Sequence, residues 1–230
     1  MKLVLFDIDG TLLSSEGLGR ASMRHALQEV FGSSGQDSYR YDGKTDKQIV
    51  RDVMRLEGHS DAAIDERMEY LIARYVGGLD DRIASGRYDV HPLPGVSRLL
   101  DELEKREDMV LGLLTGNIAE GARRKLSAAG LNIGRFRINA FGSDHEHRPS
   151  LPAVAQQRAN ETPGLDIERG AMIVIGDTPA DIDCGRSLGA KAIAVASGNY
   201  SVEDLRAHEP YAVFESLADT IGVMQAIDNA

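Results

Sequence analysis

The sequence predicts an α/β fold in which a parallel sheet forms the core and a helical segment follows the first strand. Short apolar runs, typical of strands buried on both faces, recur at residues 2–6, 109–114, 171–175 and 190–195. Amphipathic helical patterns alternate with these runs, which indicates parallel pairing. Residues 15–93 break the alternation, because they carry helical patterns and no convincing buried strand. We therefore expect a core of residues 1–14 and 94–230 with an inserted helical domain of residues 15–93.

Apolar residues at helical spacing define the individual helices. The inserted segment has two such stripes: Met23, Leu27, Val30 and Phe31, then Ile64, Met68, Leu71, Ile72 and Tyr75. Pro92, Pro94 and Gly95 mark the return to the core. After this return, two core helices are predicted at residues 96–103 and 118–129, and Gly130 is expected to end the second.

The composition is that of an ordinary globular protein, with 42% apolar and 27% charged residues in 230. A net charge of -10 argues against nucleic acid or an anionic membrane as the main partner, since phosphate backbones require a basic face. It leaves room for a small phosphorylated substrate. We expect no targeting segment and no membrane span. The single cysteine, Cys184, favours a reducing compartment, so we expect a cytoplasmic protein.

Polar residues follow three of the predicted strands at their carboxyl ends: Asp7 and Asp9; Thr115, Gly116 and Asn117; Asp177 and Asp181. In open parallel sheets, ligands bind beyond these ends. Side chains two apart in an extended segment point the same way, so Asp7 and Asp9 can face one site. A hard divalent cation such as Mg²⁺ would offset their repulsion, and a hydroxyl with backbone amides can hold phosphate oxygens. The pattern predicts a phosphate-and-metal site.

Three segments of the chain resemble the motifs of one enzyme superfamily. DIDGT at 7–11, LLTGN at 113–117 and GDTPAD at 176–181 are similar to those of the haloacid dehalogenase superfamily of phosphatases. The helical insertion resembles the cap of its phosphoglycolate phosphatase-like and β-phosphoglucomutase-like branch. The resemblance implies a Rossmann-like three-layer core with a helical cap. It also implies a Mg²⁺-dependent phosphatase that acts on a small phosphomonoester such as phosphoglycolate, a sugar phosphate or a nucleotide.

The resemblance also implies a role for each matched residue. Asp7 would be the nucleophile that forms an aspartyl-phosphate. Asp9 would be the general acid for the leaving alcohol and then the general base for water. Thr115, with Gly116 and Asn117, would bind the transferring phosphoryl group. Mg²⁺ would be held by four residues: Asp7, Asp9 through its backbone carbonyl, Asp177 and Asp181.

The superfamily normally has a lysine that offsets the negative charge around the nucleophile. At the expected place this chain has Arg148, which carries the same charge and a fork suited to phosphate oxygens. Lys125 is the reserve candidate, although we expect it to be a solvated surface lysine. His145 and His147 beside Arg148 could be interpreted as a transition-metal site. Two histidines on a polar loop do not show the three or four converging ligands that such a site requires.

The cap is expected to select the substrate. Charged or polar candidates are Arg20, Arg24, Lys44, Thr45, Lys47 and Arg51. The segment 43–51 is favoured among them, because its glycine and threonine would let the backbone approach the site. We therefore predict Thr45, Lys47 and Arg51 as substrate-binding residues.

Asp9 favours phosphate-ester chemistry over dehalogenation, which needs no acid to protonate an alkoxide. Two alternatives to the phosphatase remain open from the sequence. A β-phosphoglucomutase-like phosphomutase shares the motifs and returns the phosphoryl group to its substrate. A non-catalytic phosphate-binding regulatory module would keep the fold without turnover, although the intact motif residues argue against it. We expect either a monomer or a homodimer.

Overall fold

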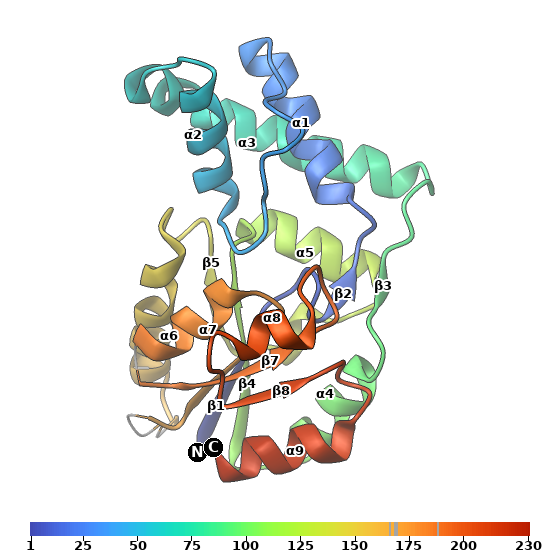
Figure 1. Cartoon of the computed structure of the whole chain (residues 1–230), viewed down its shortest axis with the longest axis vertical. Helices are drawn as coiled ribbons and strands as arrows, with labels where there is room; N and C mark the ends of the chain where they lie inside the picture. The colour runs from blue at the N-terminus through green and yellow to red at the C-terminus, as the bar shows by residue number, and fades with distance from the viewer. Residues whose placement is uncertain (166, 168–169, 188) are drawn as a thin grey trace.

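Six parallel strands form the central sheet in the computed structural model, which describes residues 1–165, 167, 170–187 and 189–230 (Figure 1). Their order across the sheet is β5 (Ile138–Phe141), β4 (Met109–Thr115), β1 (Lys2–Phe6), β6 (Met172–Gly176), β7 (Lys191–Val195) and β8 (Ala212–Phe214). Each pairing between neighbours is parallel. The four apolar runs of the sequence form β1, β4, β6 and β7, so their prediction as strands is confirmed. The short outer strands β5 and β8 were not indicated by the pattern.

Helices cover both faces of the sheet. Val4 and Phe6 contact one layer and Leu3 and Leu5 the other, because successive strand residues point to opposite faces. The first layer contains α4 (Val96–Glu104), α5 (Ala119–Ala128) and α9 (Thr220–Asn229), and the second contains α6 (Leu151–Glu161), α7 (Pro179–Ser187) and α8 (Val202–Arg206). Cys184 on α7 is fully buried against the second layer. The expected three-layer α/β core is therefore confirmed.

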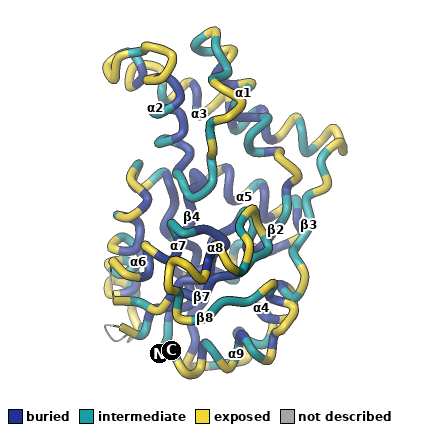
Figure 2. Tube along the Cα trace, viewed as in Figure 1, coloured by how far each residue is buried: buried dark blue, intermediate teal, exposed yellow. Residues whose placement is uncertain are grey.

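Three helices from the inserted segment lie together beyond one edge of the core (Figure 1): α1 (Leu18–Phe31), α2 (Asp46–Leu56) and α3 (Asp61–Ala84). They share a hydrophobic cluster of their own, which includes Leu27, Val53 and Leu71. Figure 2 shows buried segments on the inner sides of these helices and exposed segments at their outer ends. Burial of this shared face stabilises the three helices as a unit. We refer to residues 15–93 as the cap.

The two connections between core and cap pair with each other. β2 (Leu13–Ser14) and β3 (His91–Pro92) form a short antiparallel ribbon in which Leu13 lies opposite Pro92. These strands could not be predicted from the sequence, because two residues are too few for a periodic pattern to emerge. The ribbon ties both ends of the cap to one point of the core.

The topology places a crevice at the end of β1. The chain runs from β1 outward through β4 to β5 on one side, and through β6, β7 and β8 on the other. The strand order thus reverses next to β1, and such a switch point leaves space for a ligand beyond the carboxyl ends of the strands. None of the helices in the described residues combines the length and the hydrophobicity that crossing a bilayer requires.

Candidate active site

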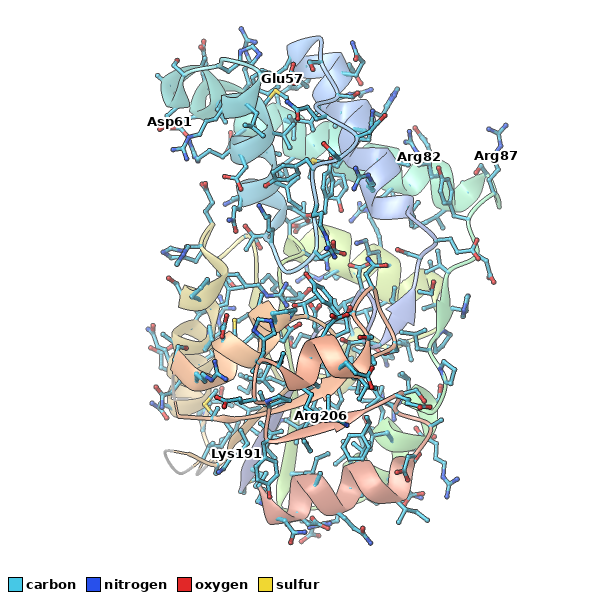
Figure 3. The ribbon with its side chains drawn as sticks, in the orientation of Figure 1. Glu57, Asp61, Arg82, Arg87, Lys191 and Arg206 are labelled. Atoms are coloured by element: carbon cyan, nitrogen blue, oxygen red, sulfur yellow. The ribbon has the colours of Figure 1, made fainter. Side chains whose placement is uncertain are left out.

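A cavity of about 540 Å³ lies between the strand ends and the cap. Its floor includes Asp7, which follows β1, Thr115 at the end of β4, and Asp177, which follows β6. The three strands are direct neighbours in the sheet, so the three sequence motifs meet at one place. Figure 3 labels Glu57, Asp61, Arg82 and Arg87 on outer parts of the cap, and none of these residues lines the cavity.

Three buried carboxylates form a cluster on the floor. Asp7, Asp177 and Asp181 each offer an oxygen, and these oxygens lie within 4.8 Å of one another. Burial raises the pKa of Asp7 to about 6, with Arg148 opposing the shift and Asp181 adding to it. Burial, followed by the charges of Asp7 and Asp181, raises the pKa of Asp177 well above its ordinary value. Such a hard oxygen set fits Mg²⁺, since a cation would relieve both the repulsion and the desolvation.

The Asp177 carboxylate sits in a cradle that glycine alone permits. A Cβ atom at Gly10 would lie 2.3 Å from its Oδ2, and one at Gly198 would lie 1.8 Å from the same atom. Thr11 donates a hydrogen bond of 3.0 Å from Oγ1 to Asp177 Oδ1. The backbone thus holds Asp177 in place while its oxygens remain beside Asp7, as a metal ligand requires.

Within the described residues, no second group of this kind exists. His145 and His147 belong to an exposed loop, where the His147 backbone N–H donates to His145 Nδ1 at 2.9 Å. The side chain of Asp9 also lies outside the acidic cluster. A role of Asp9 as a metal ligand therefore depends on its backbone carbonyl, as the resemblance implied.

Arg148 lies beside Asp7, the expected nucleophile, as the sequence suggested. It opens a short 3₁₀ helix (Arg148–Ser150) and is buried, with 3% of its surface exposed. Its Nη2 lies 3.3 Å from Asp7 Oδ1 and donates a short hydrogen bond to Asp181 Oδ1. One guanidinium group thus contacts two carboxylates of the acidic cluster and offsets part of their negative charge.

Lys125 is not the solvated surface residue that we expected, so that interpretation is wrong. It is 4% exposed, and its Nζ lies 2.7 Å from Asp9 Oδ2 and 2.7 Å from Asn117 Oδ1. The sequence held a signal, because position 125 lies on α5 three residues after Ala122 and one before Leu126. Both neighbours belong to the buried stripe, which places Lys125 on the inner side of the helix.

Asp9 is held by three donors from different parts of the chain. Oδ2 accepts from Lys125 and from Asn117 Nδ2 at 2.8 Å, and Oδ1 accepts from Ser15 Oγ at 3.1 Å. Burial alone would raise the pKa of Asp9, but Lys125, Asn117 and Ser15 together hold it below its ordinary value. Asp9 and Asp7 line the same cavity yet have separate positive partners.

The end of β4 contributes three neighbouring residues to the cavity. Thr115 Oγ1 accepts from Asn117 Nδ2 at 2.9 Å, so Asn117 contacts both Thr115 and Asp9. Gly116 lies directly beneath the cap, since a Cβ atom there would be 2.0 Å from the carbonyl oxygen of Lys44. The backbone N–H of Asp46 donates to the Gly116 carbonyl at 2.9 Å. The structure therefore brings Thr115, Gly116 and Asn117 to the cavity, as predicted.

Thr45, Lys47 and Arg51 contact the core rather than the cavity. Lys47 Nζ donates to the Ser143 carbonyl at 3.1 Å, and Arg51 pairs with Glu146. Thr45 Oγ1 donates to the Glu146 carbonyl at 2.6 Å and accepts from the backbone N–H of Gln48, which caps α2. The structure thus differs from the expected substrate contacts: these residues bind the loop at 143–146.

Other residues form the cap side of the cavity, among them Arg20, Tyr39, Tyr41 and Lys44. The guanidinium carbon of Arg20 lies 4.7 Å from the centre of the Tyr41 ring, and Lys44 Nζ donates to Tyr39 Oη at 2.6 Å. The sequence analysis named Arg20 and Lys44 as candidates and missed both tyrosines, because they lie in a loop without periodic pattern.

The chain is similar to known proteins over nearly its whole length. A family model for haloacid dehalogenase-like hydrolases matches residues 4–195. Pyrophosphatase PpaX of Halalkalibacterium halodurans is 25% identical over 225 residues, which cover 96% of this chain and 95% of the relative. Phosphoglycolate phosphatase of Rhodospirillum rubrum is 26% identical over 241 residues, with 97% and 92% of the two chains covered. A hydrolase from Pseudomonas syringae, solved by crystallography, has a TM-score of 0.76 at 22% identity over 98% of each chain. Because the family model spans most of the sequence, including all three strand-end motifs, this chain belongs to the haloacid dehalogenase-like hydrolase family.

Proposed function

We propose that the protein is a Mg²⁺-dependent phosphatase that hydrolyses a small phosphomonoester through an aspartyl-phosphate at Asp7. The observation that carries this proposal is the separation of two aspartates in one cavity. Asp7 lies in the acidic cluster beside Arg148, whereas Asp9 is held by Lys125 and Asn117. Two carboxylates in different surroundings can serve different steps, one as nucleophile and one as acid and base.

In the first step, an Asp7 oxygen attacks phosphorus and the bond to the leaving oxygen breaks. Thr115, which lies at the strand end beside Asp7, contributes a hydroxyl to the transferring phosphoryl group. Arg148 offsets the charge of Asp7 and Asp181 as the phosphate approaches. Asp7, Asp177, Asp181 and the Asp9 carbonyl would hold Mg²⁺, which supplies positive charge to the phosphoryl oxygens.

Proton transfer is assigned to Asp9. Its acid form gives a proton to the leaving oxygen, and its carboxylate then takes a proton from the water that attacks the phosphoenzyme. The side chain is 39% exposed and lines the cavity, so it can reach a substrate oxygen while three donors fix its orientation.

The cavity supports a small, polar substrate. A volume of about 540 Å³ is within the usual range of small-molecule sites, and Arg20, Tyr41 and Lys44 line it from the cap. The named relatives act on pyrophosphate and phosphoglycolate, which are both small phosphorylated compounds. We propose a small phosphorylated metabolite of this size as the substrate class.

Hydrolysis of p-nitrophenyl phosphate tests the proposal. We expect activity with Mg²⁺, loss of activity with EDTA, and loss in Asp7→Asn, followed by a screen of phosphorylated metabolites to find the best substrate. Activity that survives in Asp7→Asn would contradict the nucleophile assignment. Conversion of a hexose phosphate into its isomer without release of phosphate would favour the mutase instead. Binding of phosphate compounds without any turnover would favour a regulatory module.

A further inference from the structure

The ammonium group of Lys125 is enclosed between the core and the cap. From the core, Asp9 and Asn117 each accept a hydrogen bond of 2.7 Å from Nζ. From the cap, Gly19 lies so close that a Cβ atom there would be 2.9 Å from Nζ and 3.7 Å from Tyr75 Oη. A lysine buried in this way is rare unless its charge is paired.

Asp46 brings a second carboxylate from the cap towards the same lysine. Its Oδ2 accepts a hydrogen bond of 2.9 Å from the backbone N–H of Ile118, at the start of α5. Burial raises the pKa of Asp46 to about 6, and Lys125 is the main group that opposes this shift. The Lys125 charge therefore interacts with Asp9 in the core and with Asp46 in the cap.

Lys125 is not placed to neutralise the nucleophile. Arg148 already contacts Asp7 at 3.3 Å, whereas Lys125 contacts Asp9 at 2.7 Å. Among the three donors to Asp9, Lys125 is the charged one, and it also fixes Asn117, which is a second donor. Removing Lys125 would take away one donor to the Asp9 Oδ2 atom and one of the contacts that hold Asn117, the other donor to that atom.

We propose that Lys125 is a positioning residue that fixes the Asp9 carboxyl group for proton transfer at the substrate oxygen. The inference rests on the proposed function. The proton moves from the Asp9 carboxyl group to the leaving oxygen as the P–O bond breaks, and later from water to the Asp9 carboxylate. Lys125 donates no proton in either step; it acts on the rate through the Asp9 carboxyl group, which it holds in place.

Two aromatic phosphomonoesters that differ in the basicity of their leaving oxygen separate this role from a structural one. p-Nitrophenyl phosphate releases a phenolate that leaves without a proton, whereas benzyl phosphate releases an alcohol that must be protonated. We expect Lys125→Met to lower kcat for benzyl phosphate by about 100-fold or more, the usual scale of general acid catalysis. For p-nitrophenyl phosphate, the rate constant of the phosphorylation step is measured as the rate of p-nitrophenol release in the first turnover. Lys125→Met should lower this rate constant by no more than about fivefold.

A neighbouring arginine provides the matched control. Arg124 lies on the same helix and contacts the cap through Asp80 at 2.7 Å, but it is outside the cavity. Arg124→Met should change the rates measured with the two probes by the same small factor. An equal loss on both probes in Lys125→Met would overturn the positioning role and leave the proposed function standing. Absence of Asp7-dependent hydrolysis of either probe would overturn both.

Two more variants keep the test independent of folding. Asp9→Asn should remove most benzyl phosphate turnover, and adding Lys125→Met to it should cause little further loss, because both changes disable one group. Additive losses would contradict the inference. Gly19→Ala favours the helix and pushes only the flexible end of Lys125, so it should keep the fold. Gly19→Ala should also lower the turnover of benzyl phosphate more than that of p-nitrophenyl phosphate, by a smaller factor than Lys125→Met does. An equal loss of turnover on both probes would count against the proposal.

Discussion

Nη2 of Arg148 lies 3.3 Å from Oδ1 of Asp7, and both side chains are almost fully buried. The same atom donates to Asp181, so one arginine contacts two carboxylates of the acidic cluster and offsets part of their charge. Lys125 makes the corresponding contact to Asp9. Two separate cations, Arg148 and Lys125, therefore hold different carboxylates in one cavity, and each contact can be perturbed on its own.

Arg148→Ala should damage both activity and stability. Loss of one charge donor at the reacting group should lower kcat by about 100-fold or more. Leaving Asp7 and Asp181 buried without their partner should cost on the order of 3 kcal/mol or more in the free energy of unfolding. Steady-state kinetics and urea unfolding measure the two effects. Arg123→Ala, which removes an exposed arginine paired with Glu120, should leave both nearly unchanged. Full activity in Arg148→Ala would refute its proposed role.

Gly198→Ala should weaken Mg²⁺ binding. The new methyl group would lie 1.8 Å from Asp177 Oδ2, so the carboxylate must move away from Asp7 and Asp181. We expect the Mg²⁺ concentration for half-maximal activity to rise by about tenfold or more, the usual scale for disturbing the support of a ligand. Gly77→Ala on α3 is the control, because nothing lies within 4 Å of its added methyl group. An unchanged Mg²⁺ requirement in Gly198→Ala would argue against Asp177 as a ligand.

Removal of Mg²⁺ should destabilise the protein through the same cluster. A ligand that binds the folded state alone at 100 times its Kd adds about 2.7 kcal/mol to the free energy of unfolding. Thermal unfolding with Mg²⁺ and with EDTA measures this difference. Asp177→Asn should abolish most of it, whereas Asp101→Asn, a change on the surface of α4, should retain it. A Mg²⁺-induced shift that persists in Asp177→Asn would place the cation elsewhere.

The sequence allowed the strand ends to be predicted because each motif directly follows an apolar run. Asp7 and Asp177 could be assigned to one edge of a parallel sheet without any structure. The position of Lys125 could not, because its partner Asp9 lies 116 residues away and charged helical residues are usually solvated. The contacts of Lys47 and Arg51 with the loop at 143–146 could not be predicted for a related reason, since these partners are about as distant in sequence.

Asp46→Asn should change how stability depends on pH. Burial raises the pKa of Asp46 from 3.8 to about 6, so the folded state binds more protons than the unfolded chain between these values. The contribution of Asp46 to stability is then greatest at low pH and is lost as the pH rises through 6. Asparagine keeps an oxygen that accepts from the Ile118 N–H but carries no charge, so it avoids the cost of burying an ionised carboxylate.

Relative to the wild type, we expect Asp46→Asn to gain on the order of 1–2 kcal/mol between pH 4.5 and pH 7, measured by urea unfolding with Mg²⁺ present. For Asp101→Asn, a change at an exposed position, the difference in free energy of unfolding from the wild type should not increase between pH 4.5 and pH 7. A constant difference between Asp46→Asn and the wild type across this range would contradict the burial argument.

Phosphorylation of Asp7 is the step on which the proposed mechanism depends. It can be observed by mixing Asp9→Asn with p-nitrophenyl phosphate and Mg²⁺, since the first step needs no acid with this substrate while the second step lacks its base. We expect a burst of p-nitrophenol close to one equivalent per enzyme. After acid quench, intact mass and peptide analysis should find one phosphoryl group on Asp7. A burst without an adduct, an adduct on another residue, or the same adduct in Asp7→Asn would refute this mechanism.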